Sequence, residues 1–240
     1  MFNCNVLCAK RNPAGHYAAD FLSQQGIKIA DSPGPDVTHL LLPVPSFPSG
    51  DTYLAYILSD LPDHIIVSGG MLQTPLLENY RTVDFLRDPF YLAENAAITA
   101  DCTANILLEK FPHLKDVPVL ILGWGRIGKC LGHLLQLHEA DVTITARKSD
   151  DVAIIHALGF TGKYTGQIRE YLSRYRVIIN TVPELILPGV DTDPDTLIID
   201  LASKPGITGA NVLSARGLPG KMAPEKSGRL IAKTFMRLSI

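Results

Sequence analysis

Six residues from Gly123 to Gly128 form the clearest chemical pattern in this 240-residue chain. They read Gly-Trp-Gly-Arg-Ile-Gly, directly after the strand-like run Val117–Leu122 and before an amphipathic helical pattern. In that setting the first glycine allows a tight turn, the second admits a pyrophosphate to the backbone, and the third lets helix and strand pack closely. The motif predicts a dinucleotide site with the phosphates at the helix N-terminus. The alternative is a plain strand-turn-helix with incidental glycines.

The next predicted strand, Asp141–Ala146, indicates which dinucleotide is bound. An NAD-preferring site carries Asp or Glu near the end of this strand, where the carboxylate binds the ribose 2′-hydroxyl. Here the strand is followed by Arg147 and Lys148. A guanidinium at this place can grip a 2′-phosphate or stack on adenine, so we expect NADP(H). The alternative is that both basic residues belong only to the solvated start of a helix.

Further cofactor contacts are expected after two later apolar runs, Val177–Thr181 and Leu197–Leu201. Parallel sheets bind ligands at the carboxyl ends of their strands, so both following loops should border the nicotinamide. The full set of expected cofactor-binding residues is Gly123, Trp124, Gly125, Arg126, Ile127, Gly128, Ala146, Arg147, Lys148, Thr181, Val182, Pro183, Asp200, Leu201, Ala202 and Pro219.

A histidine relay is not expected in this chain. A dehydrogenase of a hydroxy acid needs a base for the hydroxyl proton, and that base is usually His. The last histidine is His156, and the stretch where two-domain 2-hydroxyacid dehydrogenases carry Pro-His reads Met222-Ala223-Pro224-Glu225. The chemistry must therefore proceed without a histidine in the C-terminal third.

Short apolar runs alternate with helical segments along the whole chain, which predicts an α/β fold with parallel sheets. Thr38–Pro43 and Ile65–Ser68 are continuous apolar runs of the kind found in strands buried on both faces. A longer helical pattern from about Tyr91 to Phe111 indicates a connection between two domains. We expect a flavodoxin-like N-terminal domain over residues 1–96 and a doubly wound parallel-sheet Rossmann domain over 97–223. A final helix, 224–240, is expected to pack back on the first domain.

Composition narrows the function classes. Hydrophobic residues make up 46% and charged residues 19%, an ordinary globular balance that excludes a disordered chain. A net charge of −2 argues against a nucleic-acid-binding protein.

The two halves of the chain differ in charge. Residues 1–110 hold 6 basic and 12 acidic side chains, whereas residues 111–240 hold 16 basic and 12 acidic ones. A basic second half suits a domain that handles phosphate, although chance distribution over solvated faces explains it equally well.

The sequence gives no sign of a membrane or a metal. No stretch reaches about 18 apolar residues and the N-terminus has no export pattern, so we expect a cytoplasmic protein without a membrane span. Cys4, Cys8, Cys102 and Cys130 lack the paired spacing of a zinc site, and no metal is expected. Reduced thiols are the default for such a protein.

The second half of the chain resembles a known family. Its runs VLILGWGRIGKCLGHLL, VTITARKSDDVAIIHALGF, VIINTVPELIL, LIIDLASKPG and GLPGKMAPEKSGRLIA are similar, in order and spacing, to the A subunit of dipicolinate synthase. The first half resembles that family more loosely, through LLPVPS, VSGG and YRTVDFLRDPFYLAENAAITADCTANILLE. The first domain is shorter than the family's, and Ile207 interrupts the Gly-Gly-Thr-Asp expected after Pro205.

The resemblance implies an enzyme that oxidises a dihydrodipicolinate-type ring to dipicolinate during sporulation and passes the hydride to NADP+. It also implies that a flavoprotein-like B subunit is its partner. Aromatisation supplies driving force and acidifies the leaving proton, which fits the missing histidine. The small dicarboxylate substrate calls for cations and backbone N–H groups, and Lys204 is the expected catalytic residue. Expected substrate-binding residues are Ser46, Ser68, Gly69, Asn95, Thr99, Lys204 and Lys221, with turn formation or helix capping as the alternative for each.

Two other functions stay open at this point. One is a 2-hydroxyacid-dehydrogenase-like enzyme that acts on another substrate and has lost its relay. The other is a non-catalytic, NADP-binding regulatory subunit, which the short first domain favours. The sequence leaves the oligomeric state open as well, with a homo-oligomer among the alternatives.

Overall fold

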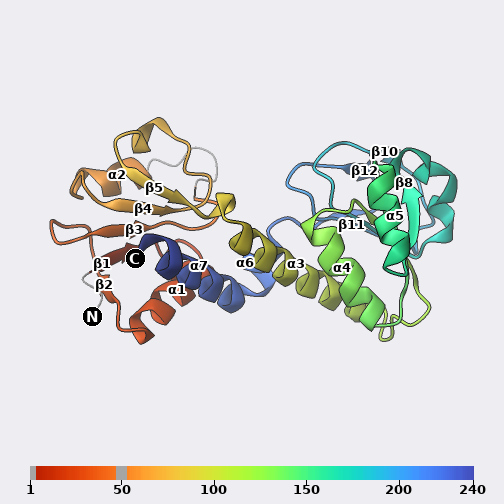
Figure 1. Ribbon diagram of the computed structural model, residues 1–240, viewed down its shortest axis with the longest axis horizontal. Coiled ribbons are helices and arrows are strands. Elements are labelled where there is room, and N and C mark those ends of the chain that lie inside the picture. The colour runs from red at the N-terminus through yellow and green to blue at the C-terminus, as the bar shows by residue number, and fades with distance from the viewer. Residues whose placement is uncertain (1–3, 47–52) are drawn as a thin grey trace. The chain divides into compact units, whose positions relative to one another are not determined.

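The computed structural model describes residues 4–46 and 53–240. The chain divides into two compact units, each with its own parallel sheet (Figure 1). The first unit consists of Met1–Asn95 and Pro219–Ile240, and the second of Ala96–Leu218. The chain passes from one unit to the other within α3 (Pro89–Lys110) and again within α6 (Leu218–Met222). Two parallel-sheet units with alternating helices and strands confirm the expected fold class.

A five-stranded parallel sheet in the order β2-β1-β3-β4-β5 forms the centre of the first unit. This is the flavodoxin-like order, in which the chain reverses its direction across the sheet between β1 and β3. Right-handed crossovers therefore place α1 and α2 on opposite faces. The elements of this unit are β1 (Asn5–Cys8), α1 (Pro13–Gln24), β2 (Lys28–Ala30), β3 (His39–Leu41), α2 (Tyr53–Ser59), β4 (Ile66–Gly69), η1 (Pro75–Leu77), β5 (Arg81–Asp84), η2 (Phe85–Arg87) and α7 (Pro224–Ser239).

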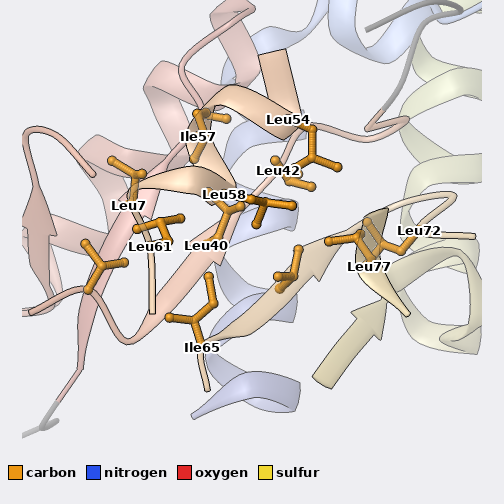
Figure 2. Close-up of a cluster of buried hydrophobic side chains, with 13 residues drawn as sticks. Leu7, Leu40, Leu42, Leu54, Ile57, Leu58, Leu61, Ile65, Leu72 and Leu77 are labelled. Atoms are coloured by element: carbon orange, nitrogen blue, oxygen red, sulfur yellow. The ribbon is translucent and has the colours of Figure 1, made fainter. Parts of the chain in front are cut away.

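A cluster of leucine and isoleucine side chains fills the space between this sheet and α2 (Figure 2). Leu40 from β3 and Ile65 just before β4 are fully buried, and Leu54 and Ile57 come from α2. Each buried aliphatic side chain of this size stabilises the fold by about 1.5–3 kcal/mol relative to exposure. The uninterrupted apolar runs of the sequence are thus explained by strands that are covered on both faces.

The C-terminal helix α7 belongs to the first unit, although it is the last element of the chain. A Cβ at Gly228 would lie 2.5 Å from Cβ of Tyr17, so α7 and α1 are packed too closely for a larger residue there. At the end of α7 the carbonyl of Ser239 accepts a hydrogen bond from Nε2 of His39 at 3.0 Å. Burial lowers the pKa of this histidine. Arg237 donates to both carboxylate oxygens of Asp88, which holds the pKa of Asp88 below its usual value.

The second unit is a six-stranded parallel sheet in the order β13-β11-β9-β6-β7-β8. Counted from β6 this is the dinucleotide-binding order, with the switch point between β6 and β9. A separate pair, β10-β12, lies outside this sheet. Besides the C-terminal part of α3, the elements are β6 (Pro118–Leu122), α4 (Arg126–Leu137), β7 (Asp141–Ala146), α5 (Ser149–Ala157), β8 (Thr161–Tyr164), η3 (Thr165–Arg174), β9 (Val177–Asn180), β10 (Leu187–Val190), β11 (Leu197–Asp200), β12 (Ile207–Gly209) and β13 (Val212–Ser214).

Residues of β6, β9 and β11 form the core of this second sheet, and Ile121, Ile179 and Ile199 are fully buried. Residues Thr165–Arg174 form a 3₁₀-type segment, η3, in which each turn is tighter than in an α-helix. Among residues 4–46 and 53–240, no helix is long and apolar enough to cross a membrane.

Candidate functional site

The three glycines of the motif have three different environments. Gly123 has a φ of +103°, and a Cβ there would lie 2.7 Å from Val182. A Cβ at Gly128 would lie 2.1 Å from the carbonyl oxygen of Gly123, because α4 approaches the end of β6 at that point. A Cβ at Gly125, in contrast, would meet no atom within 4 Å. The fold itself requires glycine at Gly123 and Gly128, whereas at Gly125 only a ligand would.

Helix α4 begins directly at this open glycine. Gly125 is its N-cap residue, and no side chain caps the helix there. The first backbone N–H groups of a helix have no partner within the helix and carry a partial positive charge. This end of α4 therefore offers donors to an anion that lies over Gly125.

A cavity of about 370 Å³ opens beside the glycine turn. The loops after β6, β7 and β9 contribute to its wall, as expected for the switch point of an open α/β sheet. Its lining residues are Gly123, Trp124, Gly125, Ala146, Arg147, Lys148, Asp151, Thr165, Thr181, Val182, Pro183, Glu184 and Ile186.

Arg147 and Glu184 form an ion pair on the wall of this cavity. Nη1 of Arg147 lies 3.3 Å from Oε2 of Glu184, and the two side chains are 75% and 62% exposed. The pair joins the loop after β7 to the loop after β9. Trp124, in the glycine turn, packs edge-on against Phe160 with ring centroids 6.2 Å apart, and the Lys129 ammonium lies 5.5 Å from its ring. The cavity wall thus carries charged side chains and, at Trp124, an aromatic ring.

Asn180 and Asp200 form a buried network below the loops after β9 and β11. Nδ2 of Asn180 donates to Oδ1 of Asp200 at 2.8 Å and to the carbonyl of Val182 at 3.0 Å. The other oxygen of Asp200 accepts from the backbone N–H of Gly206 at 2.8 Å. A Cβ at Gly206 would lie 2.2 Å from Nδ2 of Asn180. These hydrogen bonds join the two loops. Through Asn180, Asp200 helps to hold Val182, which lines the cavity.

Comparisons with known proteins place this geometry in context. No family model matches the sequence. The dipicolinate synthase A subunit of Bacillus subtilis (strain 168) is 34% identical over an alignment of 131 residues, and the match covers 50% of this chain and 44% of that protein. The crystal structure of the dipicolinate synthase A subunit from Bacillus halodurans matches with a TM-score of 0.83 at 22% identity, covering 99% of this chain and 98% of that one. The chain is similar to the A subunit of dipicolinate synthase.

A transhydrogenase from Sinorhizobium meliloti has the same fold at greater distance. It matches with a TM-score of 0.70 at 13% identity, covering 97% of this chain and 92% of that one. The two dipicolinate synthase matches confirm the resemblance inferred from the sequence motifs. The aligned sequence spans less than half of the Bacillus subtilis protein.

Nine of the expected cofactor residues line the cavity: Gly123, Trp124, Gly125, Ala146, Arg147, Lys148, Thr181, Val182 and Pro183. The others do not. Arg126, Ile127 and Gly128 form the first turn of α4. Asp200 ends β11, Leu201 and Ala202 begin the loop after it, and all three are buried; Pro219 belongs to α6 in the first unit.

Four cavity residues were not expected from the sequence: Asp151, Thr165, Glu184 and Ile186. Asp151 and Thr165 lie at the starts of α5 and η3, and the fold alone brings them to the cavity. Glu184 and Ile186 directly follow the predicted Thr181–Pro183 loop. Extending that loop to the next buried residue, Leu187, would have included both.

Several substrate residues suggested by the similarity to dipicolinate synthase are engaged within the first unit. Ser46 is 4% exposed, donates to the carbonyl of Pro43 at 2.8 Å and accepts from the N–H of Gly70 at 2.9 Å. Ser68 is fully buried and pairs with the hydroxyl of Ser239 at 2.8 Å. A Cβ at Gly69 would lie 2.5 Å from Oγ of Ser46. Ser46 and Gly69 thus join the loops after β3 and β4, and Ser68 joins β4 to α7.

The remaining substrate candidates lie in different settings. Asn95 is half-buried and Thr99 is buried, both on α3. Lys204 is exposed in the loop after β11 of the second unit, and Lys221 is exposed on α6 in the first. An exposed ammonium on a loop at the carboxyl edge of a parallel sheet is free of the desolvation cost that excludes buried lysines.

Proposed function

We propose that the second unit binds NADP(H) and that the chain is the A subunit of a dipicolinate-synthase-type oxidoreductase. The observation that carries this proposal is the open space at Gly125, at the uncapped start of α4 and beside a cavity that Arg147 helps to line. A glycine that the fold does not need, next to free helix N–H groups, fits the passage of a pyrophosphate.

Different residues of the cavity bind different parts of NADP(H). The backbone at Gly125 and the first N–H groups of α4 hold the pyrophosphate. Arg147 and Lys148 supply positive charge for a 2′-phosphate, and Val182 and Pro183 offer apolar surface. NADP+ when bound supplies a hydride acceptor. The Asn180–Asp200 network holds the loop with Val182 in place.

The proposed substrate is a dihydrodipicolinate-type ring, by similarity to the A subunit of dipicolinate synthase. Its oxidation removes one hydride and one proton and leaves an aromatic pyridine, so a strong base is not required. Lys204 is proposed to pair with one of the two substrate carboxylates, because its positively charged ammonium attracts a negatively charged group. Partnership with a flavoprotein-like B subunit, together with a role in sporulation, follows from the same similarity.

A turnover assay tests this proposal. Purified protein is mixed with NADP+ and freshly generated dihydropyridine dicarboxylate, with and without the candidate partner subunit, and NADPH absorbance is followed. NADPH formation that depends on the dicarboxylate supports the proposal. Binding of NADPH without turnover in any combination would favour a regulatory subunit instead, and turnover of a 2-hydroxy acid in its place would favour the dehydrogenase alternative.

A further inference from the structure

Glu184 is an acidic residue on the wall of the cavity that we assign to NADP(H). It lies in the loop after β9, and its carboxylate contacts the guanidinium of Arg147, which lies in the loop after β7. Both residues line the same cavity. The group proposed to hold the 2′-phosphate thus already has an anionic partner within the protein.

The position of this carboxylate is unusual for the fold. An NAD site takes its carboxylate from the end of the second strand of the sheet. This chain carries Ala146, Arg147 and Lys148 at that point, so no acidic residue stands there. Glu184 brings a carboxylate to the same guanidinium from a different strand. We propose that Glu184 is a cofactor-specificity residue, which competes with the 2′-phosphate for Arg147 and thereby narrows the preference for NADP(H) over NAD(H).

The exposure of the pair makes such an exchange feasible. Both side chains are more than half exposed, so water screens their attraction and little holds the pair together. A phosphate carries more negative charge than a carboxylate and offers more acceptor oxygens to the guanidinium. Arg147 can therefore transfer to a 2′-phosphate, after which Glu184 is left beside a group of like charge. NAD(H) lacks that phosphate and leaves the ion pair undisturbed.

The other charged groups on the described cavity wall are Lys148 and Asp151. Asp151 lies in the first turn of α5, where the helix N-terminus stabilises a carboxylate. With Glu184 present the wall carries two cations and two carboxylates. Replacing Glu184 by Gln keeps the size of the side chain and leaves two cations and one carboxylate, which favours a dianionic phosphate.

Calorimetric titration of four ligands tests this inference, which rests on the proposed function. The ligands are NADPH, NADH, adenosine 2′,5′-bisphosphate and AMP, and the proteins are wild type, Glu184→Gln and Glu139→Gln. Glu139 is a matched control, because it is 68% exposed and paired with Lys115 at 3.0 Å but does not line the cavity.

We expect Glu184→Gln to bind NADPH and the bisphosphate about 3- to 10-fold more tightly, with NADH and AMP changed less than about twofold. Glu139→Gln should leave all four affinities at wild-type values. The gain should shrink at high salt, since the groups involved are exposed. In an Arg147→Ala background, Glu184→Gln should change NADPH affinity by less than about twofold, because the competition is gone.

Four results would overturn the inference. Unchanged NADPH affinity in a folded Glu184→Gln protein removes the residue from cofactor selection. An equal gain for NADPH and NADH, or a full gain in the Arg147→Ala background, assigns the effect to general electrostatics rather than to competition. If wild type binds none of the four ligands, the proposed NADP(H) site fails and this inference fails with it.

Discussion

Each unit is a doubly wound parallel sheet, and in each the loops after the strands carry glycines and small polar residues. In the first unit Ser46, Gly69 and Gly70 pack against one another, with the Ser46 hydroxyl held between two backbone groups. In the second unit Gly125 opens onto free space and the neighbouring loops line a cavity. Glycines and small polar residues at similar places thus pack the loops together in the first sheet and leave space for a ligand in the second. The space around a glycine distinguishes the two uses, whereas its presence in a motif does not.

The largest effect that would test this contrast is expected at Gly125. A valine there fits the protein, because no atom lies within 4 Å of its Cβ, but it occupies the space assigned to the pyrophosphate. We expect Gly125→Val to lose NADPH affinity by roughly 1000-fold or more while its thermal unfolding stays near wild type. Gly34→Val, at a second glycine with open surroundings, serves as the control. Tight NADPH binding by folded Gly125→Val would mean that the open glycine has no bearing on the ligand.

The next largest effect is expected at Lys204, which separates substrate binding from cofactor binding. Lys204→Met keeps the apolar stem and removes the charge. If Lys204 pairs with a substrate carboxylate, kcat/KM for a dihydropyridine dicarboxylate should fall roughly 30- to 1000-fold while NADPH affinity is retained. Coupled NADPH formation with the candidate partner subunit present gives the measurement. An unchanged kcat/KM would exclude Lys204 from the substrate site.

A smaller effect is expected at Arg147, in the wall of the cavity. Its contact with a 2′-phosphate is charge-assisted, and its loss should weaken NADPH binding about 10- to 100-fold. NADH affinity should change little in Arg147→Ala, since NADH carries no 2′-phosphate. Titration of wild type and Arg147→Ala with NADPH and NADH measures both affinities. An equal loss of affinity for the two cofactors would contradict the assignment of Arg147 to the 2′-phosphate.

The smallest effect on NADPH binding is expected in the closed loops of the first unit. Ser46→Ala removes a buried hydroxyl that joins the carbonyl of Pro43 to the N–H of Gly70. Stability should fall by about 1–3 kcal/mol, because two buried backbone groups lose their partner. Urea denaturation measures that loss, and NADPH affinity below the unfolding range should be unchanged. If Ser46→Ala kept full stability but lost turnover, Ser46 would have to be a substrate-binding residue.

Much of the fold follows from local patterns in the sequence. The buried strands β6 and β9 are mostly apolar runs and β7 is rich in β-branched residues, and the expected bounds of all three agree with the structure within a residue. Strands such as β2 (Lys28–Ala30) and β5 (Arg81–Asp84) were missed because they lie at sheet edges and carry charged or exposed residues. The order of strands within each sheet depends on contacts between distant segments, which no local pattern reveals.

The candidate site was predictable to the extent that it is local. The glycine turn and the loop with Arg147 each lie directly after a recognisable strand, so their meeting at one sheet edge follows from parallel pairing. Asp200 also ends a strand, yet its carboxylate turns inward to Asn180 and Gly206. Strand position fixes where a residue stands but not the direction in which its side chain points. The pairing of Glu184 with Arg147 depends on the structure for the same reason.

Direct titration of the wild-type protein with NADPH and NADH tests the central claim, that the open cavity of the second unit is an NADP(H) site. Calorimetry at moderate salt gives both affinities without relying on turnover or on a partner protein. The account predicts saturable one-to-one binding of NADPH, at least about tenfold tighter than that of NADH. Tighter binding of NADH, or no binding of either cofactor, would contradict it.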